Sequence, residues 1–278
     1  MRKWAVLIAL VILFAVSAVW AEDAWNCPAC GREGNTGNFC GGCGAPMPEE
    51  TAGTEETAVP ADAAEPPAAG DIVLFGRYEQ DNDPIDGTEP IEWIVLDVQD
   101  GKALLLSRYG LDAIQYHARY TAVTWEECSL REWLNGEFLA AAFSAEEQAA
   151  IPETEIDNSA AQGCPRWDTD GGNNTKDRVF LLSCAEAKRY LGVMCWEDAD
   201  GSEWSEAADV IPTAAAVAHG ARTSDGTPAT TGCWWLRSPG SQQSAAAHVY
   251  GNGMHNDTLV DSFGWIVRPA MWVDLGTF

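Results

Sequence analysis

The sequence predicts an α+β domain over residues 71–278, and three observations support this fold class. The segment opens with short runs of β-branched and aliphatic residues separated by turn residues, which is typical of strands. Stretches with helical spacing and capping residues follow. Two tryptophan-rich apolar blocks with a polar segment between them then close the chain. This mixture of strands and helices indicates an α+β fold.

Three strands are expected at the start of the domain. They cover residues 72–78, 91–96 and 103–106, which are rich in Val, Ile and Leu. Residues 81–90, between the first two strands, are rich in Asp, Pro and Gly, and Asp100-Gly101 is a hairpin signal between the second and third. We therefore expect consecutive strands joined by turns.

Capping boxes mark the starts of three expected helices. In a capping box a Ser or Thr is followed three residues later by Glu, and the two side chains bond to each other's backbone N–H. The pattern occurs at Thr124/Glu127, Ser144/Glu147 and Ser183/Glu186. The first helix is expected to end or break at Asn135-Gly136. A short strand over 179–182 precedes the third helix, and residues 213–218 form a possible fourth helix closed by Gly220.

The closing segment runs from Gly232 to Val273 and contains the candidate binding site. Residues 233–240 and 264–273 are apolar, and the interval between them is rich in Gln, Ser, His, Asn and Gly. Apolar anchors beside small adaptable polar residues are typical of a binding surface on a scaffold. The simpler alternative is a Trp-rich core followed by an ordinary polar loop.

Within this interval, residues 247–251 alternate between polar and apolar, so we expect His248 and Tyr250 to share one face while Val249 points inward. Aromatic side chains would provide rigid contact area, and Asn, Gln and His would provide hydrogen bonds. The candidate ligand-facing residues are Gln242, Gln243, His248, Tyr250, Asn252, His255, Asn256, Asp257 and Trp265. The expected scaffold residues are Trp235, Arg237, Arg268, Pro269 and Trp272, with each Arg bonding to backbone carbonyls or a buried carboxylate.

The N-terminus has the features of an export signal. Arg2-Lys3 precede an apolar run that ends in small residues near Ala21, which is typical of a signal peptide over residues 1–21. The apolar run is also near the minimum length of a membrane-spanning helix, so an uncleaved anchor is the alternative. Either interpretation predicts an exported protein, located outside the cell or in the cell envelope.

Two CxxC pairs predict a structural zinc ribbon over residues 25–44. The ligands would be Cys27, Cys30, Cys40 and Cys43, with nine residues between the pairs and a glycine after each pair. Four thiolates from two tight turns suit tetrahedral zinc. Two disulfides are the alternative, because an exported location permits them.

Residues 45–70 are expected to form a disordered acidic linker. The segment contains six acidic residues, no basic residue and no aromatic residue, so it cannot bury enough apolar surface to fold. The whole chain has a formal net charge of -26. This charge argues against nucleic acid and anionic membrane surfaces as partners, because both would repel it.

No catalytic or calcium-binding motif stands out. Residues 168–171 and 198–201 resemble parts of calcium loops but lack the Gly and Glu that such a loop needs at its sixth and twelfth positions, so they indicate acidic turns. None of the four histidines stands in a motif with a nucleophilic Ser or Cys.

Eight sequence blocks follow one another in a characteristic order. They are Phe75–Tyr78, Glu89–Leu96, Ala103–Ser107, Ser129–Asn135, Ala142–Ser144, Thr175–Ser183, Trp235–Gly240 and Val267–Ala270. This order resembles a bacterial extracellular domain family of unknown function. The closing region is similar to the C-type-lectin-like domains of the formylglycine-generating-enzyme superfamily and of the variable proteins of diversity-generating retroelements.

This resemblance implies a C-type-lectin-like fold with small antiparallel sheets, flanking helices, paired first and last strands, and a long irregular segment that contacts the ligand. In the retroelement proteins the variable interval would correspond to Pro239–Val267 here. Two departures limit the resemblance. Only Cys233 stands where the formylglycine-generating enzymes have two close cysteines, and the Glu-Pro-Asn and Gln-Pro-Asp signatures of calcium-dependent lectins are absent.

The sequence therefore favours an exported, non-enzymatic protein that binds a protein or glycan ligand, with possible membrane anchoring through its N-terminal segment. Two alternatives belong to other classes. One is a metal- and cysteine-dependent oxidase of the formylglycine-generating superfamily that uses Cys233. The other is a structural module of the cell envelope.

Overall fold

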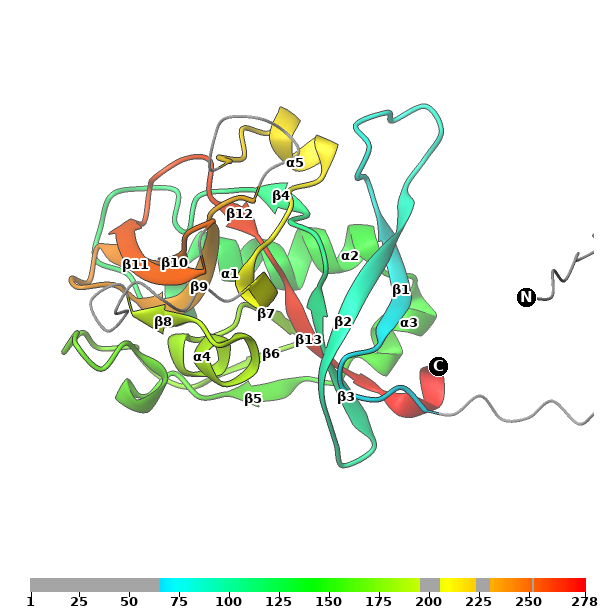
Figure 1. The fold of residues 1–278 in the computed structure, drawn as a ribbon, viewed down its shortest axis with the longest axis horizontal. Coiled ribbons are helices and arrows are strands. Elements are labelled where there is room, and N and C mark those ends of the chain that lie inside the picture. The colour runs from blue at the N-terminus through cyan, green and yellow to red at the C-terminus, as the bar shows by residue number, and fades with distance from the viewer. Residues whose placement is uncertain (1–65, 196–205, 224–230, 252) are drawn as a thin grey trace, which may run out of the picture. The chain divides into compact units, whose positions relative to one another are not determined.

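A computed structural model describes residues 66–195, 206–223, 231–251 and 253–278 (Figure 1). The predicted signal peptide, the predicted zinc ribbon and nearly all of the predicted linker lie outside these residues. Ordered contacts begin just before the expected domain start, because the Gly70 backbone N–H donates to the Val95 carbonyl over 2.8 Å. Within the described ranges no helix combines the length and the apolar character needed to cross a membrane.

A five-stranded antiparallel sheet forms one part of the domain. The strands run in the order β1-β2-β3-β13-β7. Their bounds are Ile72–Tyr78 for β1, Glu89–Gln99 for β2, Lys102–Ser107 for β3, Ala270–Asp274 for β13 and Val179–Phe180 for β7. The expected pairing of the first and last strands is wrong, because β13 pairs with β3 and β7. Residues 103–107 of β3 are all buried, which fits a central strand with a paired strand on each side. By contrast, β1 is an edge strand and exposes Ile72 and Leu74.

The predicted hairpin between the second and third strands is confirmed. Asp100 and Gly101 both have positive φ, at 50° and 75°, which is the geometry of a tight type I′ turn. Local turn chemistry therefore sets the register of β2 against β3.

The first predicted helix begins later and continues further than expected. It runs through α1 (Ser129–Trp133), a π-helical turn η2 (Leu134–Phe138) and α2 (Leu139–Ala142) without a break at Asn135-Gly136. The Asn135 side chain accepts from the Val179 N–H and donates to the Val179 carbonyl, so contacts with β7 hold the turn together. The capping box at Thr124 is also wrong, because the N-cap is Cys128, whose sulfur accepts from the Arg131 N–H.

The other two capping boxes are confirmed. Ser144/Glu147 begins α3 (Ala145–Ala150), and Ser183/Glu186 begins α4 (Cys184–Leu191), with both reciprocal hydrogen bonds present in each. The possible fourth helix is present as α5 (Ala214–Ala218), capped by Thr213. The remaining short elements are η1 (Trp125–Glu127), η3 (Ala160–Gln162), η4 (Glu206–Ala208), η5 (Leu275–Thr277) and the pair β5 (Thr154–Ile156) with β6 (Thr175–Asp177).

A curled six-stranded sheet forms the second part of the domain and contains the closing segment. Its strand order is β4-β12-β9-β10-β11-β8. The bounds are Asp112–Ala113, Ile266–Val267, Trp234–Pro239, Ala245–Val249, Met254–Leu259 and Met194–Cys195 in that order. In Figure 1, β10 and β11 lie on the opposite side of the domain from the β1–β2 hairpin.

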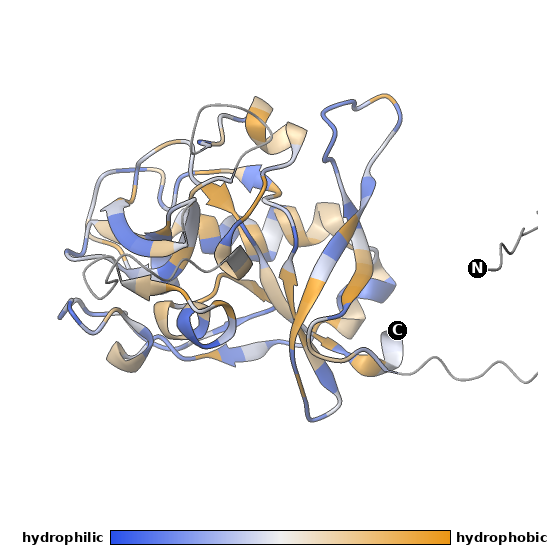
Figure 2. Cartoon of the chain, in the orientation of Figure 1, coloured by the Kyte–Doolittle hydropathy of each residue, from blue (hydrophilic) through white to orange (hydrophobic). Residues whose placement is uncertain are grey.

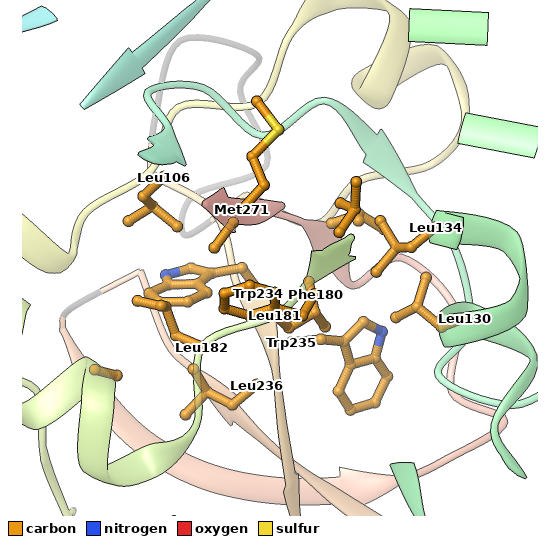
Figure 3. Packing of buried hydrophobic residues seen from close by; sticks show 14 of the residues in the cluster. Leu106, Leu130, Leu134, Phe180, Leu181, Leu182, Trp234, Trp235, Leu236 and Met271 are labelled. Carbon is orange, nitrogen blue, oxygen red and sulfur yellow. The ribbon is translucent and has the colours of Figure 1, made fainter. Parts of the chain in front are cut away.

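The core lies between the two sheets and the helices. Trp234 and Trp235 are fully buried, and Figure 3 shows them packed beside Phe180 and Met271 from the five-stranded sheet. Hydropathy follows this arrangement, with apolar residues in β3 and β13 and polar residues along β11 (Figure 2). The predicted α+β fold class is confirmed.

Candidate functional site

The candidate site is centred on strands β9, β10 and β11 of the six-stranded sheet. His248 in β10 lies directly across from Trp235 in β9 and from Asn256 in β11. The Tyr250 N–H donates to the Met254 carbonyl, and Gly253 adopts a φ of +75°, which closes the β10–β11 hairpin. The register places side chains from three strands on one face.

Four side chains form an aromatic cluster on this face: Trp235, His248, Tyr250 and Trp265. The His248 ring centroid lies 3.9 Å from that of Trp265 and 4.6 Å from that of Tyr250. The ring centroids of Trp235 and Trp265 lie 5.3 Å apart. His248 is fully buried, Trp265 is 5 % exposed, and Tyr250 is half-buried, so Tyr250 is the outermost member.

Three polar atoms of the aromatic cluster are buried without a hydrogen-bond partner in the described part of the chain. They are Nδ1 and Nε2 of His248 and Nε1 of Trp265. Burial, with a smaller contribution from His255, lowers the pKa of His248 from 6.5 to about 3, so the ring is neutral at pH 7. An unpaired buried polar group costs on the order of 1–3 kcal/mol, which makes this cluster unfavourable for stability alone.

The expectation that only Val249 points inward is wrong. Val249 and His248 are both fully buried, because both faces of β10 are covered. His255 pairs across the hairpin with Val249 and is 3 % exposed. Its ring centroid lies 6.1 Å from that of Trp167. An alternating pattern predicts an exposed face only where a sheet has one side in solvent.

The polar candidates differ in how firmly the domain holds them. The Gln243 side chain donates to two backbone carbonyls, and the Asp257 carboxylate accepts from the N–H and hydroxyl of Ser241. Gln242 is exposed and Asn256 is half-buried. Asn252 lies outside the described residues. Gln242, Asn256 and Tyr250 are therefore the candidates that a ligand could reach with the least rearrangement.

Three exposed hydrophobic residues near the hairpin were missed by the sequence reasoning. Leu259, the last residue of β11, is 42 % exposed, and Phe263, in the turn after β11, is 72 % exposed. Tyr120, 61 % exposed, lies in the neighbouring loop, where the His117 N–H donates to the Val260 carbonyl. Phe263 was detectable as a large aromatic residue inside a polar interval. Tyr120 had no comparable signal, because a contact distant in sequence brings its loop here.

A family comparison covers this whole site. The family described as a domain of unknown function, DUF6273, matches residues 100–275. The chain belongs to this family. No curated protein and no solved structure matches the chain. The matched residues of the DUF6273 domain include the aromatic cluster and its hairpin, and they leave out β1 and β2.

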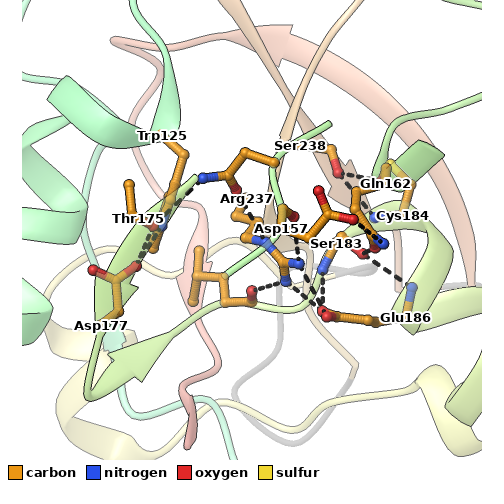
Figure 4. A network of polar contacts seen from close by, with 12 residues as sticks. Trp125, Asp157, Gln162, Thr175, Asp177, Ser183, Cys184, Glu186, Arg237 and Ser238 are labelled. Carbon is orange, nitrogen blue, oxygen red and sulfur yellow. Dashed lines mark hydrogen bonds and ion pairs between the residues drawn. The ribbon is translucent and has the colours of Figure 1, made fainter. Parts of the chain in front are cut away.

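Arg237 holds the DUF6273 domain together beneath the hairpin, as expected of a scaffold residue. Its guanidinium is buried, bonds both Glu186 carboxylate oxygens and donates to the carbonyls of Leu181 and Asp157 (Figure 4). The second expected scaffold arginine, Arg268, is also buried and donates to the Ser107 carbonyl over 3.0 Å. Both arginines therefore connect the closing segment to earlier elements.

Cys233 lacks the environment of an activated nucleophile. Its side chain is half-buried, and burial raises the pKa of the thiol above its ordinary value. A reactive cysteine needs the opposite shift, because the thiolate is the nucleophile.

Metal-ligand geometry is limited in the part of the domain that the structure describes. One group of three carboxylates, Glu79, Asp81 and Glu89, has oxygen atoms within 4.8 Å of one another. These residues lie where the loop between β1 and β2 joins the two strands, and they are exposed or half-buried. Asp170 accepts from the Gly172 N–H, which fits the predicted acidic turn. The predicted zinc ligands Cys27, Cys30, Cys40 and Cys43 lie outside the described residues.

Proposed function

We propose that this chain is an exported, non-enzymatic binding protein whose ligand surface lies between Pro239 and Val267. The observation that supports this most directly is the aromatic cluster with its three unpaired polar atoms. Natural cores pair their polar groups, and exceptions concentrate at functional sites.

The cluster also indicates which chemical groups the ligand would have. Neutral His248 offers one N–H donor and one acceptor nitrogen, and Trp265 offers an N–H donor. Hydroxyl and amide groups supply the matching acceptors and donors, and aromatic rings suit the apolar faces of sugars and peptide side chains. The proposed ligand is therefore an uncharged polar group of a glycan or a protein.

Access would be through Tyr250, the half-buried member of the cluster. A rotation of this side chain would open a route to His248, whose ring centroid is 4.6 Å away. The exposed Phe263 and Tyr120 and the polar Gln242 would then form the outer contact area. Binding would release the desolvation cost stored in the cluster, because the ligand would pair its polar atoms.

The finer architecture belongs to the same proposal. A C-type-lectin-like arrangement is supported by the long closing segment, which forms the candidate surface before the final strand enters the five-stranded sheet. The N-terminal part would hold structural zinc in a ribbon formed by Cys27, Cys30, Cys40 and Cys43. An acidic linker would separate this ribbon from the domain, and the N-terminal segment would direct export, either as a cleaved signal peptide or as a membrane anchor.

The proposal is tested by screening the purified chain against immobilised glycans and extracellular proteins. We expect a captured ligand to be lost from the Tyr250→Ala and His248→Phe variants. Tyr109→Ala is the matched control, because Tyr109 is also a half-buried tyrosine but follows β3 of the other sheet. Retained capture by both cluster variants at unchanged affinity would refute the proposed surface.

A further inference from the structure

A cavity lies apart from the aromatic cluster, on another part of the domain. It has a volume of about 300 Å³ and is bordered by β5, α4 and the strands β3 and β13. None of its lining residues belongs to the aromatic cluster. The volume is at the lower end of the range for pockets that bind small molecules or single side chains.

The floor of the cavity is apolar and aromatic. Leu104 and Phe180 are 3 % and 2 % exposed, and Trp272 is half-buried. These side chains come from three adjacent strands of the five-stranded sheet, so the floor is rigid. Such a floor suits the hydrocarbon part of a ligand, and an indole ring also attracts cations through its face.

The wall on the β5 side is acidic. Glu155 in β5 and Asp157 directly after it line the cavity on this side, whereas Glu186 lines it from α4 and is neutralised by its two bonds to Arg237. Asp157 accepts from the Ser159 N–H and the Gln162 amide, which hold the pKa of its carboxyl below the ordinary value. Among the described residues neither Asp157 nor Glu155 forms an ion pair within 4.0 Å, although Arg237 also lowers the pKa of the Asp157 carboxyl and Lys176 lies directly across from Glu155 in the β5–β6 pair. Both carboxylates are exposed and border the cavity.

The cavity's own cation is already engaged. Arg189 lines the cavity, but its side chain is 69 % exposed and its guanidinium lies 3.4 Å from Asp97 and 4.8 Å from the Tyr190 ring centroid. Arg189 is thus paired with a carboxylate that does not line the cavity. The chain's formal net charge of -26 adds a long-range attraction for cations.

We infer that this cavity binds a cationic group on an apolar stem, an ammonium or a guanidinium, with the stem on the Trp272 floor and the charge between Glu155 and Asp157. The same chemistry is present in free amines and in the Lys and Arg side chains of basic peptides. The inference does not depend on the proposed function of the aromatic cluster.

Calorimetric titration of the full chain tests this inference with three probes. The first is a Gly-Arg-Gly peptide blocked at both ends, the second is the same peptide with neutral citrulline in place of Arg, and the third is agmatine. We expect the Arg peptide to bind and the citrulline peptide not to bind. Tighter binding of agmatine than of the peptide would indicate a free amine as the ligand, and the reverse order would indicate a protein side chain.

Matched variants locate the binding. Glu155→Gln should weaken binding of the Arg peptide about twofold to fivefold, as expected for one partly exposed charge pair, and the charge reversal Glu155→Lys should abolish it. Glu153→Gln is the control, because Glu153 is also exposed and acidic but does not line the cavity. An unchanged melting temperature would show that each variant is folded.

Equal affinity for the Arg and citrulline peptides, or unchanged binding by Glu155→Lys, would overturn the inference. The same would follow from no binding of any probe at millimolar concentration. The Tyr250→Ala variant should bind these probes as the wild type does, so failure here and failure of the proposed glycan or protein surface are distinguishable.

Discussion

Replacing His248 with phenylalanine should stabilise the DUF6273 domain. It should also remove the part of the loss of stability at acid pH that comes from protonation of His248. The imidazole is fully buried with both nitrogens unpaired, so the folded state must keep it neutral and without hydrogen bonds. Phenylalanine has a similar shape and no polar atom. Removing the unpaired nitrogens should raise the free energy of unfolding at pH 7 by about 1–3 kcal/mol.

The pH dependence follows from the pKa of His248, which is about 3 in the folded chain against an ordinary 6.5. Between these values the unfolded chain binds a proton that the folded chain does not, so stability is full above pH 6.5 and falls as the pH drops toward 3. Between pH 7 and pH 5 this linkage costs the wild type about 2 kcal/mol, at 1.36 kcal/mol for each pH unit below 6.5.

Urea denaturation of both proteins at pH 7, 6 and 5 is the measurement. Other titrating groups affect both proteins, so the difference between the two curves isolates His248 together with its influence on His255. We expect the stability gap to widen by about 2 kcal/mol from pH 7 to pH 5. A gap that stays constant with pH would refute the neutral, buried imidazole. His248→Leu repeats the test if the larger phenyl ring strains the cluster.

Three further results are expected from variants and from metal analysis. In urea denaturation, Gly76→Ala should destabilise the domain by about 1–3 kcal/mol more than Gly101→Ala. Both glycines have positive φ, but a Cβ would lie 2.5 Å from the Phe143 ring at Gly76 and would meet no atom at Gly101. Arg237→Met should cost about 3–5 kcal/mol by the same measurement, because buried carbonyls and a carboxylate lose their donor; a loss below about 1 kcal/mol would contradict that role. Atomic emission should detect zinc in the purified chain and less zinc in the Cys40→Ser variant. A zinc content in Cys40→Ser equal to that of the wild type would exclude the zinc ribbon.

The parts of the fold predicted from sequence are those set by neighbouring residues. The Asp100-Gly101 turn needs only two residues that tolerate positive φ, and the capping boxes at Ser144 and Ser183 need only a partner three residues later. The polar candidate residues in and beside the β10–β11 hairpin could also be identified from composition. The interval after Pro239 stands out because it is rich in Gln, Ser, His, Asn and Gly.

The parts that were wrong depend on distant contacts. Asn135-Gly136 looks like a helix stop, but β7 supplies hydrogen bonds that keep the helix going. The Thr124 pattern looks like a capping box, but the helix begins at Cys128 instead. At Asn135-Gly136 the tertiary contacts outweigh a local preference worth about 1 kcal/mol.

The sequence by itself determined the α+β class, the main turns and caps, and the segment in which the candidate site lies. Only the tertiary structure decided that β13 enters the sheet beside β3, that both faces of β10 are covered and that His248 is buried beside Trp265. The physical reason is that a residue's local pattern sets its backbone conformation and the side on which it points. Whether that side meets water or another layer depends on elements far along the chain, which no local pattern specifies.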